Sequence, residues 1–178
     1  MKSAVFIERD GLLNKIQSGP KGPVTPRTLG EFSVNEGAIE PLRRLHIAGF
    51  TLIVTTHQPG LIQGDLSRTV LDGMHRVLYR AFPGLINDMF VCPHTESSGC
   101  PCRRPRPGLI IESAFKWHVD PRRSFLVSNH PDDAQVAHFA GCASVLVRSP
   151  WLGDVRGDYL VDDLPAAVST IIEKSAVS

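Results

Sequence analysis

Short apolar runs alternate with stretches of helical spacing along most of this chain. The β-rich apolar runs predict strands over residues 4–8, 50–55, 88–91, 123–128, 143–148 and 159–161. Helical periodicity predicts helices over residues 37–48, 65–82, 108–117, 131–140 and 165–175. Strands that alternate with helices in this way form βαβ units. We therefore predict an α/β protein whose parallel sheet is covered by helices on both faces.

Several of the predicted helices carry signals at their ends. Gly49 is placed to end the first helix, and Asp65 is the predicted N-cap of the second. In the third helix, Ile111, Phe115 and Trp117 recur at helical spacing. We expect these three side chains to pack against the rest of the protein.

Two segments follow neither the helical nor the strand period. Residues 16–32 hold three prolines among several glycines, which predicts a long loop or flap. Residues 92–107 are rich in cysteine, proline and arginine. A chain of 178 residues is long enough to bury one core, and no linker-like stretch divides it. We expect a single domain over residues 1–178.

The bulk composition excludes several classes of protein. Hydrophobic residues make up 42% of the chain and charged residues 21%, with a formal net charge of +1. This balance gives no overall attraction to nucleic acid or to a membrane surface. No apolar run approaches the roughly 18 residues that span a bilayer. The N-terminus lacks the apolar core of a signal peptide, so we expect a cytoplasmic protein.

Two carboxylates lie at the end of the first predicted strand. Glu8 and Asp10 are two residues apart on extended backbone, so their side chains point to the same side. Gly11 follows, where the chain must turn away. Open α/β folds bind their ligands at this carboxyl edge of the sheet. Two like charges this close need a cation or a role in proton transfer, although a solvated acidic loop is the alternative interpretation.

A cysteine and histidine cluster lies in the segment over residues 92–107. The pattern is Cys-x-His-x5-Cys-x-Cys, formed by Cys92, His94, Cys100 and Cys102. Three thiolates and one imidazole are a typical ligand set for structural, tetrahedral zinc. This loop has few apolar residues that could stabilise it, and bound zinc would supply the missing folding free energy. The alternatives are a reduced cluster without metal or a redox pair, and Cys142 is assigned to core packing.

Four stretches in order resemble the motifs of one enzyme superfamily. Residues 5–14 read VFIERDGLLN, residues 54–60 read VTTHQPG, residues 102–108 read CRRPRPG and residues 126–133 read LVSNHPDD. Together with the zinc pattern they resemble haloacid-dehalogenase (HAD) superfamily phosphatases. Within that superfamily they are most similar to the D-glycero-D-manno-heptose 1,7-bisphosphate phosphatase and histidinol-phosphate phosphatase group. The resemblance covers residues 4–148.

The resemblance implies a fold and a chemistry. The fold would be a Rossmann-like HAD core with a parallel sheet, a minimal cap, a zinc-binding loop over residues 92–107 and a flap over residues 16–32. In such phosphatases a first-motif Asp attacks phosphorus, and the Asp two residues later transfers protons. A hydroxyl and a cation bind the phosphoryl group, and fourth-motif acids hold Mg²⁺.

Carried over residue by residue, the catalytic pattern is only partly kept. Glu8 stands where the nucleophilic Asp is expected, and its extra methylene moves the carboxylate by about 1.5 Å. A misplacement of ~1 Å can slow a reaction on the order of 100-fold. Asp10 matches the acid/base residue, Thr56 matches the phosphate-binding hydroxyl, and Arg104 replaces the usual Lys.

Substrate contacts are implied at four positions of the second and third motifs. The resemblance assigns substrate binding to His57, Gln58, Arg103 and Arg104. His57 stands where the group usually has Asn. A solvated basic face is the alternative for the arginines, which lack the interleaved aromatic residues of a nucleic-acid surface.

The implied magnesium site is the most altered part. Its ligands would be Glu8, Asp10, Asn129 and Asp133. Ser128-Asn129 replaces the usual Gly-Asp, so one position offers an oxygen without a negative charge. Because hard cations rely on carboxylates, we expect weaker Mg²⁺ binding. Ordinary loop variation on an active enzyme is the alternative, as is a coupled shift of Glu8 and the metal.

We therefore expect a zinc-stabilised, HAD phosphatase-fold protein that acts on or binds a small sugar phosphate, with catalysis weakened by Glu8 and Asn129. If active, it would be a Mg²⁺-dependent phosphoric monoester hydrolase of carbohydrate metabolism. One alternative is a catalytically silent pseudophosphatase that binds a phosphate ligand and serves a regulatory role, with a protein partner. Another is an interaction domain that uses the zinc-binding loop as its contact surface.

Overall fold

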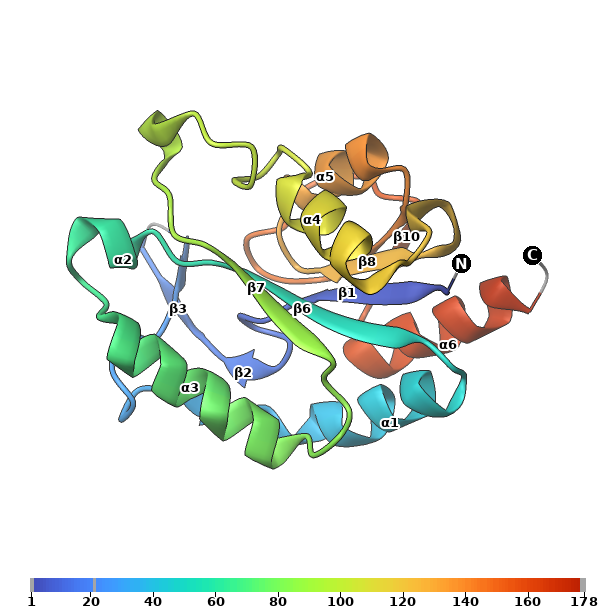
Figure 1. The fold of residues 1–178 in the computed structure, drawn as a ribbon, viewed down its shortest axis with the longest axis horizontal. Coiled ribbons are helices and arrows are strands. Elements are labelled where there is room, and N and C mark those ends of the chain that lie inside the picture. Colours follow the sequence, from blue (N-terminus) through green and yellow to red (C-terminus); the bar gives the residue numbers. More distant parts are fainter. Residues whose placement is uncertain (1, 21, 177–178) are drawn as a thin grey trace.

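A parallel sheet forms the centre of the computed structural model, which describes residues 2–20 and 22–176. Within these residues the sheet has six strands in the order β10-β9-β8-β1-β6-β7, and all neighbours run parallel. The strands are β1 (Ala4–Glu8), β6 (Thr51–His57), β7 (Asp88–Cys92), β8 (Phe125–Ser128), β9 (Ala143–Val147) and β10 (Tyr159–Val161). The predicted α/β class with a parallel sheet is confirmed, and Figure 1 shows the arrangement.

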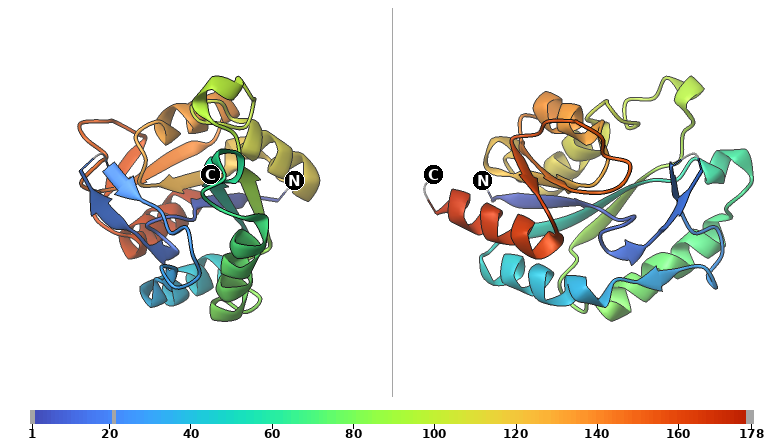
Figure 2. Two further views of the ribbon diagram at one scale, coloured as in Figure 1. Left: turned by 90° about the vertical axis from the view of Figure 1, so that its left-hand side faces the viewer. Right: turned by 180° about the vertical axis from the view of Figure 1, so that it is seen from behind.

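Helices cover both faces of this sheet. One face carries α1 (Ile39–Ile47), α3 (Arg68–Ala81) and α6 (Leu164–Ser175), and the other carries α4 (Gly108–Trp117) and α5 (Asp133–Ala140) (Figures 1 and 2). A single-turn helix, α2 (Gly60–Gln63), follows β6. None of the helices described combines the length and the apolar character that crossing a bilayer requires.

The core explains why the first strand is a continuous apolar run. All five residues of β1 are buried, since helices lie on both sides of the sheet. Val5 and Ile7 pack into the core on the side of α1 and α6, whereas Ala4 and Phe6 pack on the side of α4 and α5. This alternation is the period of two expected for extended backbone. It fixes the direction in which the strand's last residue, Glu8, points.

Two details of the predicted helices are wrong. Helix α3 begins after Ser67 and not after Asp65, because the Ser67 hydroxyl accepts a hydrogen bond from the Val70 amide at 3.2 Å. Phe115 is 83% exposed and Ile111 is 48% exposed, so neither packs into the core. Helix α4 buries the opposite stripe, which leaves these two on its outer side.

The predicted flap has more structure than the sequence indicated. A hairpin of β3 (Gln17–Gly19) and β4 (Gly22–Val24) lies within residues 16–32, and Lys21 is outside the described residues. At its base β2 (Asn14–Lys15) pairs with β5 (Ser33–Val34). The hairpin, α2 and the loop between β7 and α4 gather at one end of the sheet (Figures 1 and 2). This is the carboxyl end of β1 and β6.

Helix α6 offers a local test of the fold. The Asp163 carboxylate accepts a hydrogen bond from the Ala166 amide at 2.8 Å and so caps the helix. We expect Asp163→Ala to lower the free energy of unfolding by about 1 kcal/mol, as for other N-cap losses. Urea denaturation measures this. Asp162→Ala is the matched control, because it removes only the exposed ion pair with Arg148 and should change stability by less than about 0.5 kcal/mol. Equal losses in both variants would contradict the assignment of the cap.

Candidate functional site

The ends of three neighbouring strands meet at one small pocket. Strands β1, β6 and β8 lie side by side and end at Glu8, His57 and Ser128. The pocket beside them has a volume of about 250 Å³. Its polar walls are formed by Glu8, Asp10, His57, Arg103, Arg104, Asn129 and His130. Ile16, Pro23 and Thr25 of the flap line it as well, together with Pro59 and Trp151.

The Asp10 carboxylate is held by several internal donors. Arg9 donates from Nη2 to both of its oxygens, at 2.8 and 3.1 Å. Gln58 donates to Oδ2 at 2.7 Å, and the Thr56 hydroxyl lies 3.3 Å from the same oxygen. Thr56 is fully buried and Gln58 is 2% exposed. The structure therefore places these two predicted site residues behind Asp10 and not on the pocket wall.

Arg9 is a site residue that the sequence reasoning missed. Its side chain is fully buried, and its guanidinium lies 5.6 Å from the centre of the Phe32 ring. Nη1 lies 3.4 Å from Nε2 of His75 in α3. Burial, aided by the Arg9 charge, lowers the pKa of His75 to about 4, so this imidazole is neutral and can accept. The sequence signal that could have identified Arg9 is its place between two acidic residues, Glu8 and Asp10, at the end of a strand.

A second buried arginine joins two further carboxylates. Arg104 donates from Nη2 to Oε2 of Glu8. Its Nε lies 3.3 Å from Oδ1 of Asp133, an ion pair without hydrogen-bond alignment. The other Asp133 oxygen accepts from the Ser128 hydroxyl at 2.5 Å. Burial raises the pKa of Glu8 to about 8, while the Arg104 guanidinium opposes that rise. Glu8 thus depends on Arg104 to carry a charge in this environment.

His57 connects Arg104 to the cysteine-rich loop. Burial and the neighbouring Arg104 charge lower the pKa of His57 to about 2, so the ring is neutral. Nδ1 lies 2.7 Å from Nη2 of Arg104, and because a guanidinium can only donate, Nδ1 must accept. The ring proton is therefore on Nε2, which can donate to the Cys102 carbonyl oxygen at 3.2 Å, so the Arg104 amide nitrogen, also 3.2 Å from Nε2, is a contact and not a donor to it. The imidazole is a bridge between the loop and the pocket.

Asn129 faces backbone rather than an open position. Its Nδ2 donates to the Asp10 carbonyl oxygen at 3.3 Å. This close approach of the Asn129 side chain to the backbone requires glycine at position 11. Gly11 has a φ of +84°, and a Cβ added there would lie 2.3 Å from Nδ2 of Asn129. The Ser149 hydroxyl donates to the Asn129 carbonyl at 3.0 Å. The amide group is thereby fixed between the ends of β1 and β8.

The predicted magnesium ligands do not fit a divalent cation as they are arranged. Glu8 and Asp133 contact Arg104, Asp10 is paired with Arg9, and Asn129 presents its amide nitrogen to a carbonyl. Among the residues described, the one group of three or more His, Cys, Asp or Glu that converges as a metal site lies elsewhere. The carboxylates of the pocket are neutralised from within the chain.

That convergent group is the cysteine and histidine cluster. The ligand atoms of Cys92, His94, Cys100 and Cys102 all lie within 4.8 Å of one another. The Sγ atoms of Cys92 and Cys102 lie 3.9 and 3.4 Å from that of Cys100, and Nδ1 of His94 lies 3.8 Å from Sγ of Cys92. Zinc–sulfur bonds of about 2.3 Å place tetrahedral ligands about 3.8 Å apart. These donors therefore fit a tetrahedral zinc ion.

The rest of the loop is tied to its own backbone. Arg103, which also lines the pocket, donates to the His94 carbonyl at 3.2 Å, and Arg106 donates to the Cys100 carbonyl at 2.6 Å. The loop returns to α4 at Gly108, where an added Cβ would lie 2.4 Å from the Pro101 carbonyl oxygen. Order in the loop therefore positions both Arg103 and Arg104 at the pocket.

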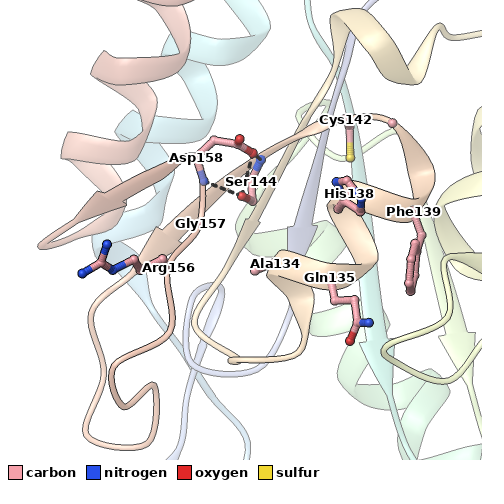
Figure 3. A pocket seen from close by; sticks show the side chains of 10 residues that line it. Ala134, Gln135, His138, Phe139, Cys142, Ser144, Arg156, Gly157 and Asp158 are labelled. Atoms are coloured by element: carbon pink, nitrogen blue, oxygen red, sulfur yellow. Dashed lines mark hydrogen bonds between the residues drawn. The ribbon is translucent and has the colours of Figure 1, made fainter.

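A larger hollow elsewhere lacks comparable chemistry. It has a volume of about 870 Å³ and lies between α5 and the segment that precedes β10 (Figure 3). Its acidic group, Asp158, already accepts from the Ser144 hydroxyl and amide, each at 2.8 Å. Arg156 and His138 line it at separate places in Figure 3. None of the predicted site residues lines this hollow, so we assign the function to the smaller pocket.

Known proteins resemble this chain over almost its whole length, although no family model matches it. D-glycero-beta-D-manno-heptose-1,7-bisphosphate 7-phosphatase of Pseudomonas aeruginosa is 30% identical, over 97% of this chain and 99% of its own. D-glycero-alpha-D-manno-heptose-1,7-bisphosphate 7-phosphatase of Mycobacterium bovis is 32% identical, over 89% and 83%. The crystal structure of D,D-heptose 1,7-bisphosphate phosphatase from B. bronchiseptica, complexed with magnesium and phosphate, has a TM-score of 0.84 at 28% identity, over 98% and 99%.

Proposed function

Because the chain belongs to the family of heptose-1,7-bisphosphate 7-phosphatases within the HAD superfamily, we propose that its pocket binds a small sugar phosphate and hydrolyses it slowly. The relatives are named for a heptose bisphosphate, and a sugar phosphate of this kind is the first candidate ligand. The slow step would be attack on phosphorus, for which Glu8 replaces the expected Asp.

One observation carries the proposal. Arg103 and Arg104 line the same small pocket as Glu8 and Asp10, at the carboxyl edge of the sheet. Guanidinium groups are suited to phosphoryl oxygens, which they bind through several parallel N–H donors. A volume of about 250 Å³ suits a phosphoryl group and part of a small sugar rather than a polymer.

The chain's own residues suggest how the work is divided. Asp10 would give a proton to the leaving oxygen and later take one from water, in the orientation that Arg9 and Gln58 impose. Arg104 would bind the phosphoryl group. Glu8 can attack only after it leaves Arg104, which holds its carboxylate in the structure. Both this release and the longer side chain slow the covalent step.

We propose that the cysteine and histidine cluster binds structural zinc. The four donors fill a tetrahedral coordination sphere, which leaves no position for substrate. Bound zinc would stabilise the loop and, through the Cys102 carbonyl and His57, the position of Arg104. Its contribution to phosphate binding is therefore indirect.

A silent phosphate-binding protein is the second candidate function. The contact between Glu8 and Arg104 favours this function, because Arg104 holds the carboxylate that stands at the position of the nucleophile. The amide of Asn129 favours it as well, since it brings no charge to a cation. In this case the pocket would keep its ligand and lose the covalent step.

A phosphomonoester panel tests these functions with purified, zinc-loaded protein. We expect inorganic phosphate and sugar phosphates to bind by calorimetry, and turnover to be at least on the order of 100-fold below that of the relatives. Asp10→Asn, once circular dichroism shows that it is folded, should have no remaining turnover, whereas Glu173→Ala, which removes an exposed carboxylate on α6, should not change it. Turnover equal to that of the relatives would contradict the slowed step. Failure of every phosphate to bind would refute the proposed function, and binding without turnover would favour the silent protein.

A further inference from the structure

The pocket already contains positive charge from its own side chains, at the place where the sequence resemblance implies a metal ion. Asp10 and Asp133 supply two negative charges, Arg9 and Arg104 supply two positive ones, and Glu8, whose pKa is raised to about 8, is mostly protonated near neutral pH. His57 is neutral. The buried groups are therefore nearly balanced without any ion from solution, and buried charges are stable only when they are paired in this way.

Arg104 lies between two of these carboxylates. Its side chain is 9% exposed, with Glu8 at Nη2 and Asp133 at 3.3 Å from Nε. His57 accepts from the same Nη2 at 2.7 Å. A cation that bridged Glu8 and Asp133 would have to displace this guanidinium. Such a displacement would leave Arg104 unpaired in a buried place, which is strongly unfavourable.

One nitrogen of Arg104 remains open. Among the described residues, none accepts a hydrogen bond from Nη1, and Arg104 lines the pocket. This nitrogen can donate to a ligand oxygen while Nη2 keeps its contacts with Glu8 and His57. Arg104 can therefore bind a phosphoryl group without giving up its place between the carboxylates.

Asn129 offers a metal only a neutral amide at the other approach. Its Nδ2 donates to the Asp10 carbonyl oxygen at 3.3 Å. This nitrogen does not ligate Mg²⁺, and the remaining amide oxygen brings no negative charge, whereas hard cations rely on carboxylates. By contrast, the donor atoms of the cysteine and histidine cluster converge within 4.8 Å. The same fold thus shapes one metal site and leaves the other unformed.

We propose that the Arg104 guanidinium takes the place of the divalent cation in this pocket, so that phosphate binds without a metal ion. The ligand in this statement rests on the proposed function. The inference that the pocket needs no divalent cation rests on the carboxylate and amide contacts alone. The two statements can therefore fail separately.

A titration with Mn²⁺, a paramagnetic substitute for Mg²⁺, tests directly whether the pocket binds a divalent cation. The chain has two tryptophans, which serve as site probe and internal reference. Trp151 lines the pocket, and Trp117 donates to Asp88 at the opposite, amino end of β7. In zinc-loaded wild type, we expect millimolar Mn²⁺ not to broaden the Trp151 indole NMR signal beyond that of Trp117. Selective broadening of the Trp151 signal would overturn the inference.

Phosphate binding supplies the second readout. In resin-treated buffer, which leaves the zinc in place, we expect the Kd of inorganic phosphate to change less than about twofold when Mg²⁺ is added. A gain of tenfold or more would also overturn the inference. If phosphate binds under neither condition, the proposed function fails, while the Mn²⁺ result still decides whether the pocket holds a metal.

Arg104→Lys is the matched variant. It keeps the charge but cannot hold Glu8 and donate to a ligand with the same rigid fork. We expect phosphate affinity in metal-free buffer to fall about tenfold. An unchanged affinity in this folded variant would contradict the role of Arg104, and circular dichroism checks that it folds.

Discussion

Removal of the proposed zinc ion from the cysteine and histidine cluster is expected to disorder the loop over residues 92–107 and to weaken phosphate binding at least tenfold. The loop is ordered by those four ligands and by hydrogen bonds to its own backbone. Without it, His57 loses the Cys102 carbonyl that orients its ring, and Arg104 loses His57. Structural zinc contributes roughly 10–16 kcal/mol to the folding of zinc-finger peptides. In this protein we expect zinc to contribute about 3 kcal/mol to the free energy of unfolding. The contribution is smaller than in a zinc finger because the large hydrophobic core remains folded without the metal.

A loss of about 3 kcal/mol would lower the Tm of a domain of this size by roughly 6–12 °C. Scanning calorimetry with and without a strong chelator measures this shift, and mass spectrometry should find one zinc ion per chain. Cys102→Ser should reproduce the effect of the chelator. Cys142→Ala is the matched control, since this buried cysteine is not one of the four converging ligands. A metal-free protein of unchanged Tm would disprove the structural role of zinc.

Restoring two carboxylates is expected to raise Mg²⁺-dependent hydrolysis at least about 100-fold. Glu8→Asp shortens the side chain by about 1.5 Å, which withdraws it from Arg104 and corrects the distance to phosphorus. Asn129→Asp replaces an amide that donates to the Asp10 carbonyl with a charged metal ligand. Together the changes supply a nucleophile and a charge for the cation.

The rate of release of inorganic phosphate measures this effect. We expect each single change to give much less than the double variant, because the nucleophile and the metal act in one event. Adding Asp10→Asn to the double variant should abolish its gain. Glu8→Gln with Asn129→Asp is the matched control, because it restores the metal ligand without a nucleophile. A double variant that binds Mg²⁺ and phosphate yet remains inactive would show that other parts of the site are also altered.

Much of the fold was predictable because its elements bury periodic apolar residues. The run from Ala4 to Ile7 is buried on both faces and predicted a central parallel strand. The N-cap of α3 was misplaced because Asp65 and Ser67 have the same preference for this position, and only the backbone shows which hydroxyl or carboxylate accepts. The hairpin within residues 16–32 was missed because prolines and glycines obscure so short a strand pair.

The candidate site was predictable in its location and not in its contacts. A strand that ends in two carboxylates identified the edge of the sheet, and the motifs brought His57, Arg104 and Asn129 to it. No spacing in the sequence shows that Arg104 contacts Glu8 and Asp133, because that contact depends on the course of a loop. Trp151 was missed for the same reason, since it reaches the pocket from the segment after β9.

The burial of Arg9 bears on how the history of this protein is interpreted. Its guanidinium has no access to water, and Asp10 is the carboxylate that balances it. A substitution that removed this acid would strand a positive charge in the interior, which typically destabilises a protein by about 3–5 kcal/mol. Folding alone would therefore select for Asp10, even in a lineage that had abandoned hydrolysis. Its presence, unlike that of an exposed acid, is not evidence that the chain still turns over a substrate.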